Sequence, residues 1–550
     1  MALNQIFLAF VWRIELWSDG IADPIAGTWR YAACAAAFVV VAACPALRGW
    51  TMRWQVLRPA SYIMAASTPV VAAACLAVAW SYATTPAYID HVEPQIAAVA
   101  WLFANGHSLW HFPGAPPHYA LPYGPLAYEI AAVVMMLLGP SIETAKLAGP
   151  AAATATLIIL WRVIRRSGHD IVTASAVSGA LLLVLYQFGV AAFWNRPDPF
   201  IVLMIATALW LRGRLAPTLR WTMMGVVAGA LFALKIHAAA CILPIAAAEI
   251  FKARSRLAAT SAMCFGAIIA IGIAFAPHGA NPIAYAAMMA VAMHHGASRE
   301  IVLLNASYVA VWMVPLGWHI WRSRRALGGA ELISAITLGA VTLLLLYPAS
   351  KFGAGPWHLM PLAPIAACLA LETVRRPTTA ADRLDQARGL CASAIIIGLF
   401  TLPATGVAQM IVMREIVDDD KAVAAHGEVH EALRRHAGQT LAVGYAGGSK
   451  YWFSHVRPVP VFQGHPYSLD AAALMDLRFA GVELGDADIK SLASCEVEVW
   501  LLPAGATPFV LESVYDAAPV FPTAFVEAFR TYHRRTARGP IFDTWVCNGT

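Results

Sequence analysis

A cluster of three arginines closes an apolar run in the stretch TLIILWRVIRR, residues 156–166. Apolar runs of membrane-crossing size, separated by short Lys and Arg clusters, recur through most of the chain. Composition agrees, because 59% of the 550 residues are hydrophobic and 13% are charged, whereas soluble proteins have about 25% charged residues. The sequence therefore predicts an α-helical polytopic membrane protein. The formal charge of +6 lies in these short clusters, which excludes a nucleic-acid-binding protein.

The apolar stretches predict about 12–14 crossings. The count depends on residues 123–162, where Gly139-Pro140 divides one long stretch into two predicted helices. The stretches fall near residues 30–47, 60–82, 123–162, 171–194, 199–211, 221–234, 238–251, 257–276, 302–321, 331–347, 358–372 and 391–413.

Positive charge predicts which connections face the cytoplasm. Six alternate connections each hold three Lys or Arg residues, centred near residues 53, 164, 215, 254, 324 and 378. The connections between them are then external, and the longest, residues 83–122, contains no Lys or Arg.

The character of the chain changes after residue 413. Residues 414–550 have ordinary charge density and no membrane-length apolar stretch. Short β-type runs at 441–445 and 497–502 alternate with helix-like stretches, which predicts a small α/β domain. The alternation of loops places this domain outside, where Cys495 and Cys547 become a disulfide candidate.

Two carboxylates stand beside a helix start in the long external loop. The loop opens with YIDHVEP, residues 88–94, and residues 94–105 predict an amphipathic interfacial helix. One interpretation is that Asp90 and Glu93 cap this helix, because its dipole favours a negative charge there. The other is that a carboxylate held at the membrane surface acts as a general base or metal ligand.

Three further polar sites interrupt apolar sequence in the predicted external connections: NRPDP at 195–199, KIH at 235–237 and SKFGAGPWH at 350–358. Each alone is typical of a turn or a snorkelling cation. Ionisable groups at the membrane are costly unless paired or solvated. Because these cations and carboxylates share one predicted face, together they predict a site for an anionic group, such as a phosphate, beside a catalytic acid.

This pattern resembles the GT-C superfamily of membrane glycosyltransferases, most of all its protein O-mannosyltransferase and aminoarabinose-transferase branch. The likeness covers most of residues 60–372 in topology and loop position. The residues that carry it are the acidic first-loop motif, Tyr123-Gly124-Pro125-Leu126, Arg196-Pro197-Asp198-Pro199 and the stretch 351–361.

The resemblance implies a GT-C-like membrane domain over residues 1–413, with 414–550 as a periplasmic α/β domain. It implies a polyprenyl-phosphate-linked sugar donor and transfer, with inversion, to a lipid, glycan or protein acceptor that the sequence does not identify. Asp90 would be the general base and Glu93 would support it. Many members have adjacent Asp-Glu, whereas two residues intervene here, so the choice between the two carboxylates stays open. Either no cofactor is required, or Asp90 and Glu93 bind a divalent cation such as Mg²⁺ or Mn²⁺.

The same resemblance assigns the remaining polar residues. Asp198 and Tyr123 would orient the cations of the site. The donor phosphate would be bound by Arg196, Lys235, Lys351, His237 and His358.

Two other functions share parts of this pattern. A transporter or flippase for lipid-linked glycans would place its site near the membrane midplane, often between inverted repeats, whereas these polar residues gather at one face. An O-antigen-ligase-like or polymerase enzyme would use the same class of donor but a large external loop late in the chain. The expected location is a bacterial inner membrane, with membrane lipid around the crossings.

Overall fold

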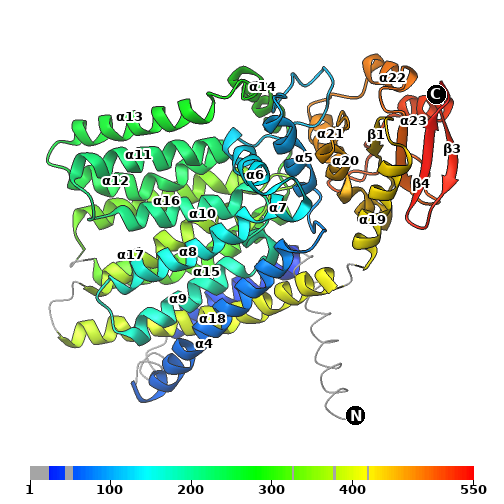
Figure 1. Ribbon diagram of the computed structural model, residues 1–550. Coiled ribbons are helices and arrows are strands. Elements are labelled where there is room, and N and C mark those ends of the chain that lie inside the picture. Colours follow the sequence, from blue (N-terminus) through cyan, green and yellow to red (C-terminus); the bar gives the residue numbers. More distant parts are fainter. Residues whose placement is uncertain (1–23, 44–53, 325–326, 376–379, 418–419, 550) are drawn as a thin grey trace, which may run out of the picture.

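The computed structural model describes residues 24–43, 54–324, 327–375, 380–417 and 420–549. Residues 1–23 of the predicted membrane domain and the end of the stretch 30–47 lie outside the described residues. Figure 1 shows a large bundle of roughly parallel helices, with a smaller C-terminal part at one end of it. Short helices lie between the two.

The helices of the bundle coincide with the apolar stretches. They are α2 (Pro24–Ala43), α4 (Trp54–Ala83), α8 (Ala148–Arg165), α9 (Ile171–Tyr186), α10 (Pro197–Leu211), α11 (Pro217–Leu234), α12 (Leu243–Lys252), α13 (Arg256–Ala274), α15 (Arg299–Ser323), α16 (Gly329–Ala349), α17 (Ala363–Arg375) and α18 (Ala380–Val417).

This is a multi-pass membrane protein. Within the described residues, eight helices are long and apolar enough to cross a membrane, and five apolar helices are shorter. Large apolar side chains on the outer helices are exposed, such as Ile268, Leu343 and Leu399 at 69%, 71% and 69%. Such surfaces suit lipid rather than water. The figure of 12–14 crossings stays a prediction.

The ambiguous stretch 123–162 is divided, as Gly139-Pro140 indicated. It forms α6 (Pro125–Leu138), the short α7 (Ile142–Lys146) and α8. Ser141 starts α7 with a capping box, because its side chain accepts a hydrogen bond from the Thr144 amide while Thr144 Oγ1 accepts one from the Ser141 amide. The chain therefore turns between α6 and α8 instead of running on as one helix.

The helix predicted at 94–105 is present as α5 (Glu93–Ala104), but its surroundings differ from the prediction. Its first eight residues, 93–100, are all buried. The reason is that α6 packs on α5 from the bundle and α20 (Pro458–Phe462) packs on it from the C-terminal part. The helix is thus enclosed by protein and does not lie along an open interface.

The C-terminal part is built on a mixed four-stranded sheet in the order β1-β2-β4-β3. The strands β1 (Leu441–Val443) and β2 (Val499–Pro503) are parallel; β1 lies within the predicted run 441–445 and β2 overlaps the run 497–502. The antiparallel strands β4 (Phe542–Cys547) and β3 (His533–Arg538) were not predicted. The other elements are α19 (Asp420–Arg435), α20, α21 (Ala471–Phe479), α22 (Asp486–Ala493), α23 (Thr523–Tyr532) and the 3-10 helix η5 (Gly448–Val456).

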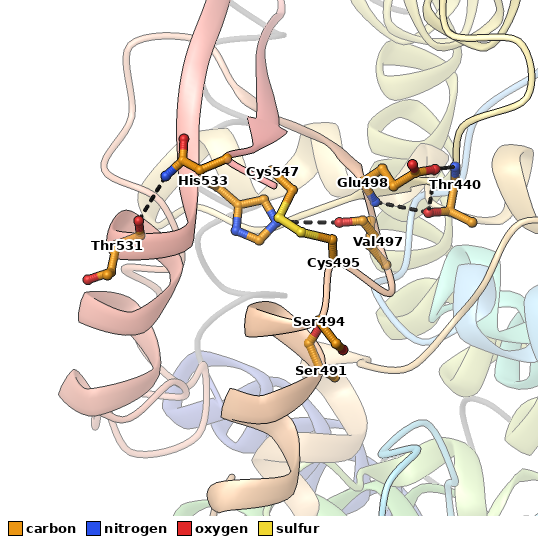
Figure 2. Close-up of a disulfide and its surroundings, with 10 residues drawn as sticks. Thr440, Ser491, Ser494, Cys495, Val497, Glu498, Thr531, His533 and Cys547 are labelled. Carbon is orange, nitrogen blue, oxygen red and sulfur yellow. Dashed lines mark hydrogen bonds between the residues drawn. A yellow bond between two sulfur atoms is a disulfide. The ribbon is translucent and has the colours of Figure 1, made fainter. Parts of the chain in front are cut away.

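A disulfide joins Cys495, which follows α22, to Cys547 at the end of β4. Figure 2 shows it beside His533, whose ring shares a hydrogen bond with the Val497 carbonyl. The cross-link connects the helix α22 to the sheet across 52 residues of sequence.

The C-terminal part packs against the connections at one end of the bundle. The long loop contacts it directly, because the His118 amide donates to Ser468 O at 2.7 Å and the Asp470 amide donates to His118 O at 2.9 Å. A helix that the sequence analysis had assigned to a connection, α14 (Pro282–Met293), contacts α21. This end of the bundle, called here the loop end, carries the candidate site.

Candidate functional site

Asp90 and Arg196 form an ion pair at the centre of the loop end. Asp90 lies in the turn between α4 and α5, and Arg196 immediately precedes α10. The Arg196 Nη1 atom lies 3.2 Å from Asp90 Oδ1. The Arg196 side chain is 6% exposed and that of Asp90 is 20% exposed, so the carboxylate is the more accessible partner.

The charges around Asp90 decide its ionisation. Burial opposes the charged form, but the Arg196 guanidinium and the Val92 amide, which donates to Oδ1 at 2.9 Å, outweigh it. The pKa of Asp90 therefore lies below its usual value. Asp90 is a carboxylate at neutral pH and can accept a proton.

A second ion pair continues the group of charges. Lys235 follows the C-terminal end of α11, and its Nζ lies 2.7 Å from Asp198 Oδ1. Asp198 also accepts a hydrogen bond from Trp194 Nε1 at 3.1 Å, and its Oδ2 lies 4.0 Å from Arg196 Nε. Burial lowers the pKa of Lys235 to about 8 against the opposing effect of Asp198.

Tyr123 brings an aromatic ring to both cations. Its ring centroid lies 5.1 Å from Lys235 Nζ and 5.9 Å from the Arg196 guanidinium carbon. Gly124 makes this approach possible, because its amide donates to Leu234 O at 3.0 Å and a Cβ there would lie 2.1 Å from Ala233 O. A larger residue would separate the start of α6 from the end of α11.

Glu93 occupies a different environment from Asp90. It is fully buried, and it accepts hydrogen bonds from the Tyr82 hydroxyl, the Asn195 amide at 2.8 Å and the Asp90 amide at 3.3 Å. Burial and the neighbouring Asp90 carboxylate raise the pKa of Glu93. Glu93 thus ties the turn of Asp90 to the segment of Arg196.

Lys146 is a buried cation that contacts the segment before Asp90. The sequence analysis did not identify it as a site residue. It is fully buried, and its Nζ donates to the carbonyls of Tyr82, Thr85 and Ala87 at 2.5–2.6 Å. Tyr82 lies in the last turn of α4, so Lys146 ties the C-terminal end of that helix to the segment that leads to Asp90. The one signal in the sequence was a lysine in a predicted crossing.

The histidines lie beside this group, but Lys351 does not join it. The His237 and His358 rings meet edge to face at 5.2 Å. His237 follows Lys235 closely in the chain, and the Lys235 charge acts on both rings. Lys351 Nζ instead donates to Ala292 O at 2.8 Å, at the C-terminal end of α14. Helix C-terminal carbonyls attract cations, which explains where this side chain points.

Part of the chain matches a known family model. Residues 122–280, which include Tyr123, Arg196, Asp198 and Lys235, match the model of the family described as dolichyl-phosphate-mannose-protein mannosyltransferase. No curated protein sequence matches the chain.

Among solved structures, the chain is similar to ArnT from Cupriavidus metallidurans, both in the apo state and bound to undecaprenyl phosphate. Each has a TM-score of 0.53 and 14% identity, over 86% of this chain and 97% of that one. The arabinofuranosyltransferase AftD from Mycobacteria has a TM-score of 0.45 and 13% identity, over 87% of this chain and 40% of that one. The chain has the GT-C fold. The resemblance found in the sequence is thereby confirmed for the fold.

A further acidic residue near the site, Asp476, comes from the C-terminal part. Asp476, on α21, is buried, and its Oδ1 lies 3.5 Å from His295 Nε2 in the connection after α14. Burial, with Asp470 nearby, raises the pKa of Asp476 to about 8 although Arg196 opposes the shift. Nothing in the local sequence of α21 marks this residue, because only the tertiary contact brings it to the site.

The residues of the candidate site do not fit a divalent cation at Asp90 and Glu93. Glu93 accepts from N–H and O–H donors at both oxygens, and Asp90 Oδ1 faces a guanidinium. Hard cations need several free oxygen ligands. Within the described residues, no group of three or more His, Cys, Asp and Glu side chains is arranged to hold a metal ion.

Proposed function

We propose that this protein is a membrane glycosyltransferase that transfers a sugar from a polyprenyl-phosphate-linked donor to an acceptor hydroxyl at the periplasmic face of a bacterial inner membrane. The observation that carries the proposal is the juxtaposition of Asp90 with Arg196 and Lys235 at the loop end. One accessible carboxylate and two buried cations are the groups that this reaction needs.

In the proposed reaction the acceptor oxygen attacks the anomeric carbon as the bond from that carbon to the phosphate oxygen breaks. Asp90 takes the acceptor proton, and polyprenyl phosphate leaves with the bonding electrons. Attack opposite the leaving group inverts the anomeric carbon. Arg196 and Lys235 stabilise the charge that develops on the phosphate, which in a buried site is worth far more than in water.

Asp90 is better suited than Glu93 to act as the base. Asp90 is partly exposed and ionised, whereas Glu93 is fully buried and its oxygens already accept three hydrogen bonds. A base must come within hydrogen-bond reach of the proton that it removes. We therefore assign Glu93 to holding the turn of Asp90, and the proposed reaction uses no metal.

The donor class is supported by the comparisons and by an apolar cavity. ArnT, whose fold this chain shares, is known bound to undecaprenyl phosphate, and the matching family is named for a dolichyl-phosphate donor. A cavity of about 400 Å³ lies between α4, α8 and α9, with Thr68, Leu157 and Leu182 in its lining. A smaller cavity shares Leu185 with it and extends to Pro199, next to Asp198. The larger cavity offers an apolar surface for part of a prenyl tail.

The positions of the Lys and Arg clusters and of the disulfide support a periplasmic position for the loop end. The six Lys and Arg clusters favour a cytoplasmic position for the opposite end of the bundle. The disulfide between Cys495 and Cys547 belongs to the loop-end side, and disulfides persist in oxidising compartments such as the periplasm.

The test is sugar transfer by the purified full chain in detergent, with a panel of radiolabelled polyprenyl-phosphate sugars and a bacterial envelope extract as the source of acceptor. We expect one donor to be consumed, and the product to have the anomeric configuration opposite to that of the donor by NMR. Movement of intact donor across a vesicle membrane, without cleavage of the sugar–phosphate bond, would contradict the proposal and favour a flippase.

A further inference from the structure

We propose that Arg457 and Asp470, in the C-terminal part, are positioning residues that hold the turn of Asp90 in its working geometry. This inference rests on the proposed function, and it makes the C-terminal part a component of the active site.

Arg457 reaches from the C-terminal part to the backbone next to Asp90. Its Nη2 atom donates to His91 O at 2.7 Å, across 366 residues of sequence. The side chain is 1% exposed. A charged donor that is buried and aimed at a carbonyl makes one of the stronger hydrogen bonds in proteins.

Asp470 fixes the direction of that guanidinium. Its Oδ2 atom accepts from Arg457 Nε at 2.8 Å and from the Tyr467 hydroxyl, while its Oδ1 accepts from the Ala473 amide at 3.1 Å. The last contact caps the first turn of α21. The Asp470 amide in turn donates to His118 O of the long loop. Arg457 is therefore held by α21 and by the loop together, which leaves its guanidinium little freedom to turn away from His91.

The contacts from the C-terminal part lie on both sides of Asp90. Arg457 holds the carbonyl one residue after it, and the His455 ring, through Nδ1, shares a hydrogen bond with Tyr88 O at 3.2 Å, two residues before it. His455 and Arg457 come from one short segment at the end of η5. The backbone around Asp90 is thus clamped from the C-terminal part, while Arg196 contacts its carboxylate from the bundle.

This geometry has a catalytic consequence. A displacement of about 1 Å at a reacting group can lower the rate by roughly 10²-fold. A contact to the backbone of residue 91 does not touch the donor, so its loss should lower kcat and leave the donor KM unchanged. A buried ion pair that only stabilises the fold would not produce this separation.

The test compares Arg457→Lys with Arg535→Gln in the full chain. Lysine keeps the charge but lacks the planar fork that contacts Asp470 and His91 O at once. Arg535 pairs with Asp543 at 3.1 Å in the same C-terminal part, away from the turn, and serves as the matched control. We expect Arg457→Lys to lower kcat about 30- to 100-fold with the donor KM within twofold, and Arg535→Gln to stay within twofold in both.

The double variant Arg457→Lys/Asp90→Asn distinguishes a positioning role of Arg457 from a direct catalytic role. If Arg457 acts only through Asp90, Arg457→Lys should cost less than twofold in the Asp90→Asn background. An equal loss in both backgrounds, or an unchanged kcat in the single variant, would overturn the inference. If size-exclusion chromatography shows that Arg457→Lys does not fold, Tyr467→Phe replaces it as the test variant. We expect Tyr467→Phe to lower kcat about fivefold. An unchanged kcat in that variant overturns the inference. Absence of transfer by the wild type would instead count against the proposed function.

Discussion

Lys235 and Lys351 are the same residue type in two different surroundings. Lys235 is buried against Asp198 in the charged group, whereas Lys351 is partly exposed at the end of α14. We expect Lys235→Met to lower kcat/KM about 100-fold, because the leaving phosphate loses a buried cation, a loss of about 2–4 kcal/mol by analogy with an oxyanion-hole donor. We expect Lys351→Met to stay within threefold. Steady-state transfer at varied donor concentration measures kcat/KM for both variants. Equal losses of kcat/KM would contradict the assignment of Lys235, rather than Lys351, to the leaving phosphate.

Asp476 predicts a dependence of stability on pH. Its pKa is raised from 3.8 to about 8, with burial as the main cause, so folding favours the protonated form. The unfolded chain loses this proton first, and the free energy of unfolding should therefore fall as pH rises from about 4 to about 8.

The groups that face Asp476 are His295, Arg196, Asp470 and Tyr515. We expect Asp476→Asn to raise the Tm relative to wild type, and to raise it more at pH 8 than at pH 5. Thermal unfolding of both proteins in detergent at several pH values measures this. A Tm difference that is the same at pH 5 and pH 8 would show that the carboxyl does not titrate as stated.

At the scale of elements, periodicity and charge predicted most of the helices and missed particular ones for physical reasons. The apolar stretches gave α10, α11 and α13 closely, because each of these is one uninterrupted apolar helix. α14 was missed because its 12 residues are too few for a crossing. β3 was missed because HRRTAR is an edge strand with five of six residues exposed, so it shows no apolar alternation.

Gly124 predicts how closely two elements must approach. A Cβ at this position would lie 2.1 Å from Ala233 O, so Gly124→Ala should push α6 away from α11 and separate Tyr123 from Lys235. We expect transfer activity to fall at least tenfold and the Tm to fall by several degrees. Gly114→Ala is the matched control, because a Cβ there has no atom within 4 Å. The measurement is Tm with transfer rate, and wild-type behaviour of Gly124→Ala would refute the close contact.

At the scale of the whole molecule, the sequence predicted those site residues that stand out from their neighbours in the chain. Asp90, Arg196, Asp198 and Lys235 interrupt apolar sequence, and the structure brings them together. The contributions of the C-terminal part were not predictable in this way. Arg457, Asp470 and Asp476 lie in ordinary mixed sequence, and only contacts across hundreds of residues give them a place near the site.

The disulfide gives a prediction for the molecule as a whole. Closing a 52-residue separation stabilises the folded C-terminal part by about 4 kcal/mol in the chain-entropy account. We expect Cys495→Ser to lower the Tm of protein prepared from oxidising membranes, and dithiothreitol to lower the Tm of the wild type to the same value. Cys264→Ser, which removes an unpaired thiol, is the control. A Tm of the wild type that does not respond to reductant would show that the cross-link is absent from the native protein.

The most direct test of the central claim is sugar transfer by Asp90→Asn and Glu93→Gln beside the wild type, with the donor that the wild type consumes. Asn keeps the size of Asp90 but cannot accept the proton, so we expect kcat to fall at least 100-fold while the donor still binds. Glu93→Gln keeps most of the buried contacts and should retain more activity than Asp90→Asn. Nearly full activity of Asp90→Asn, with Glu93→Gln inactive although folded, would move the base to Glu93 and contradict the account.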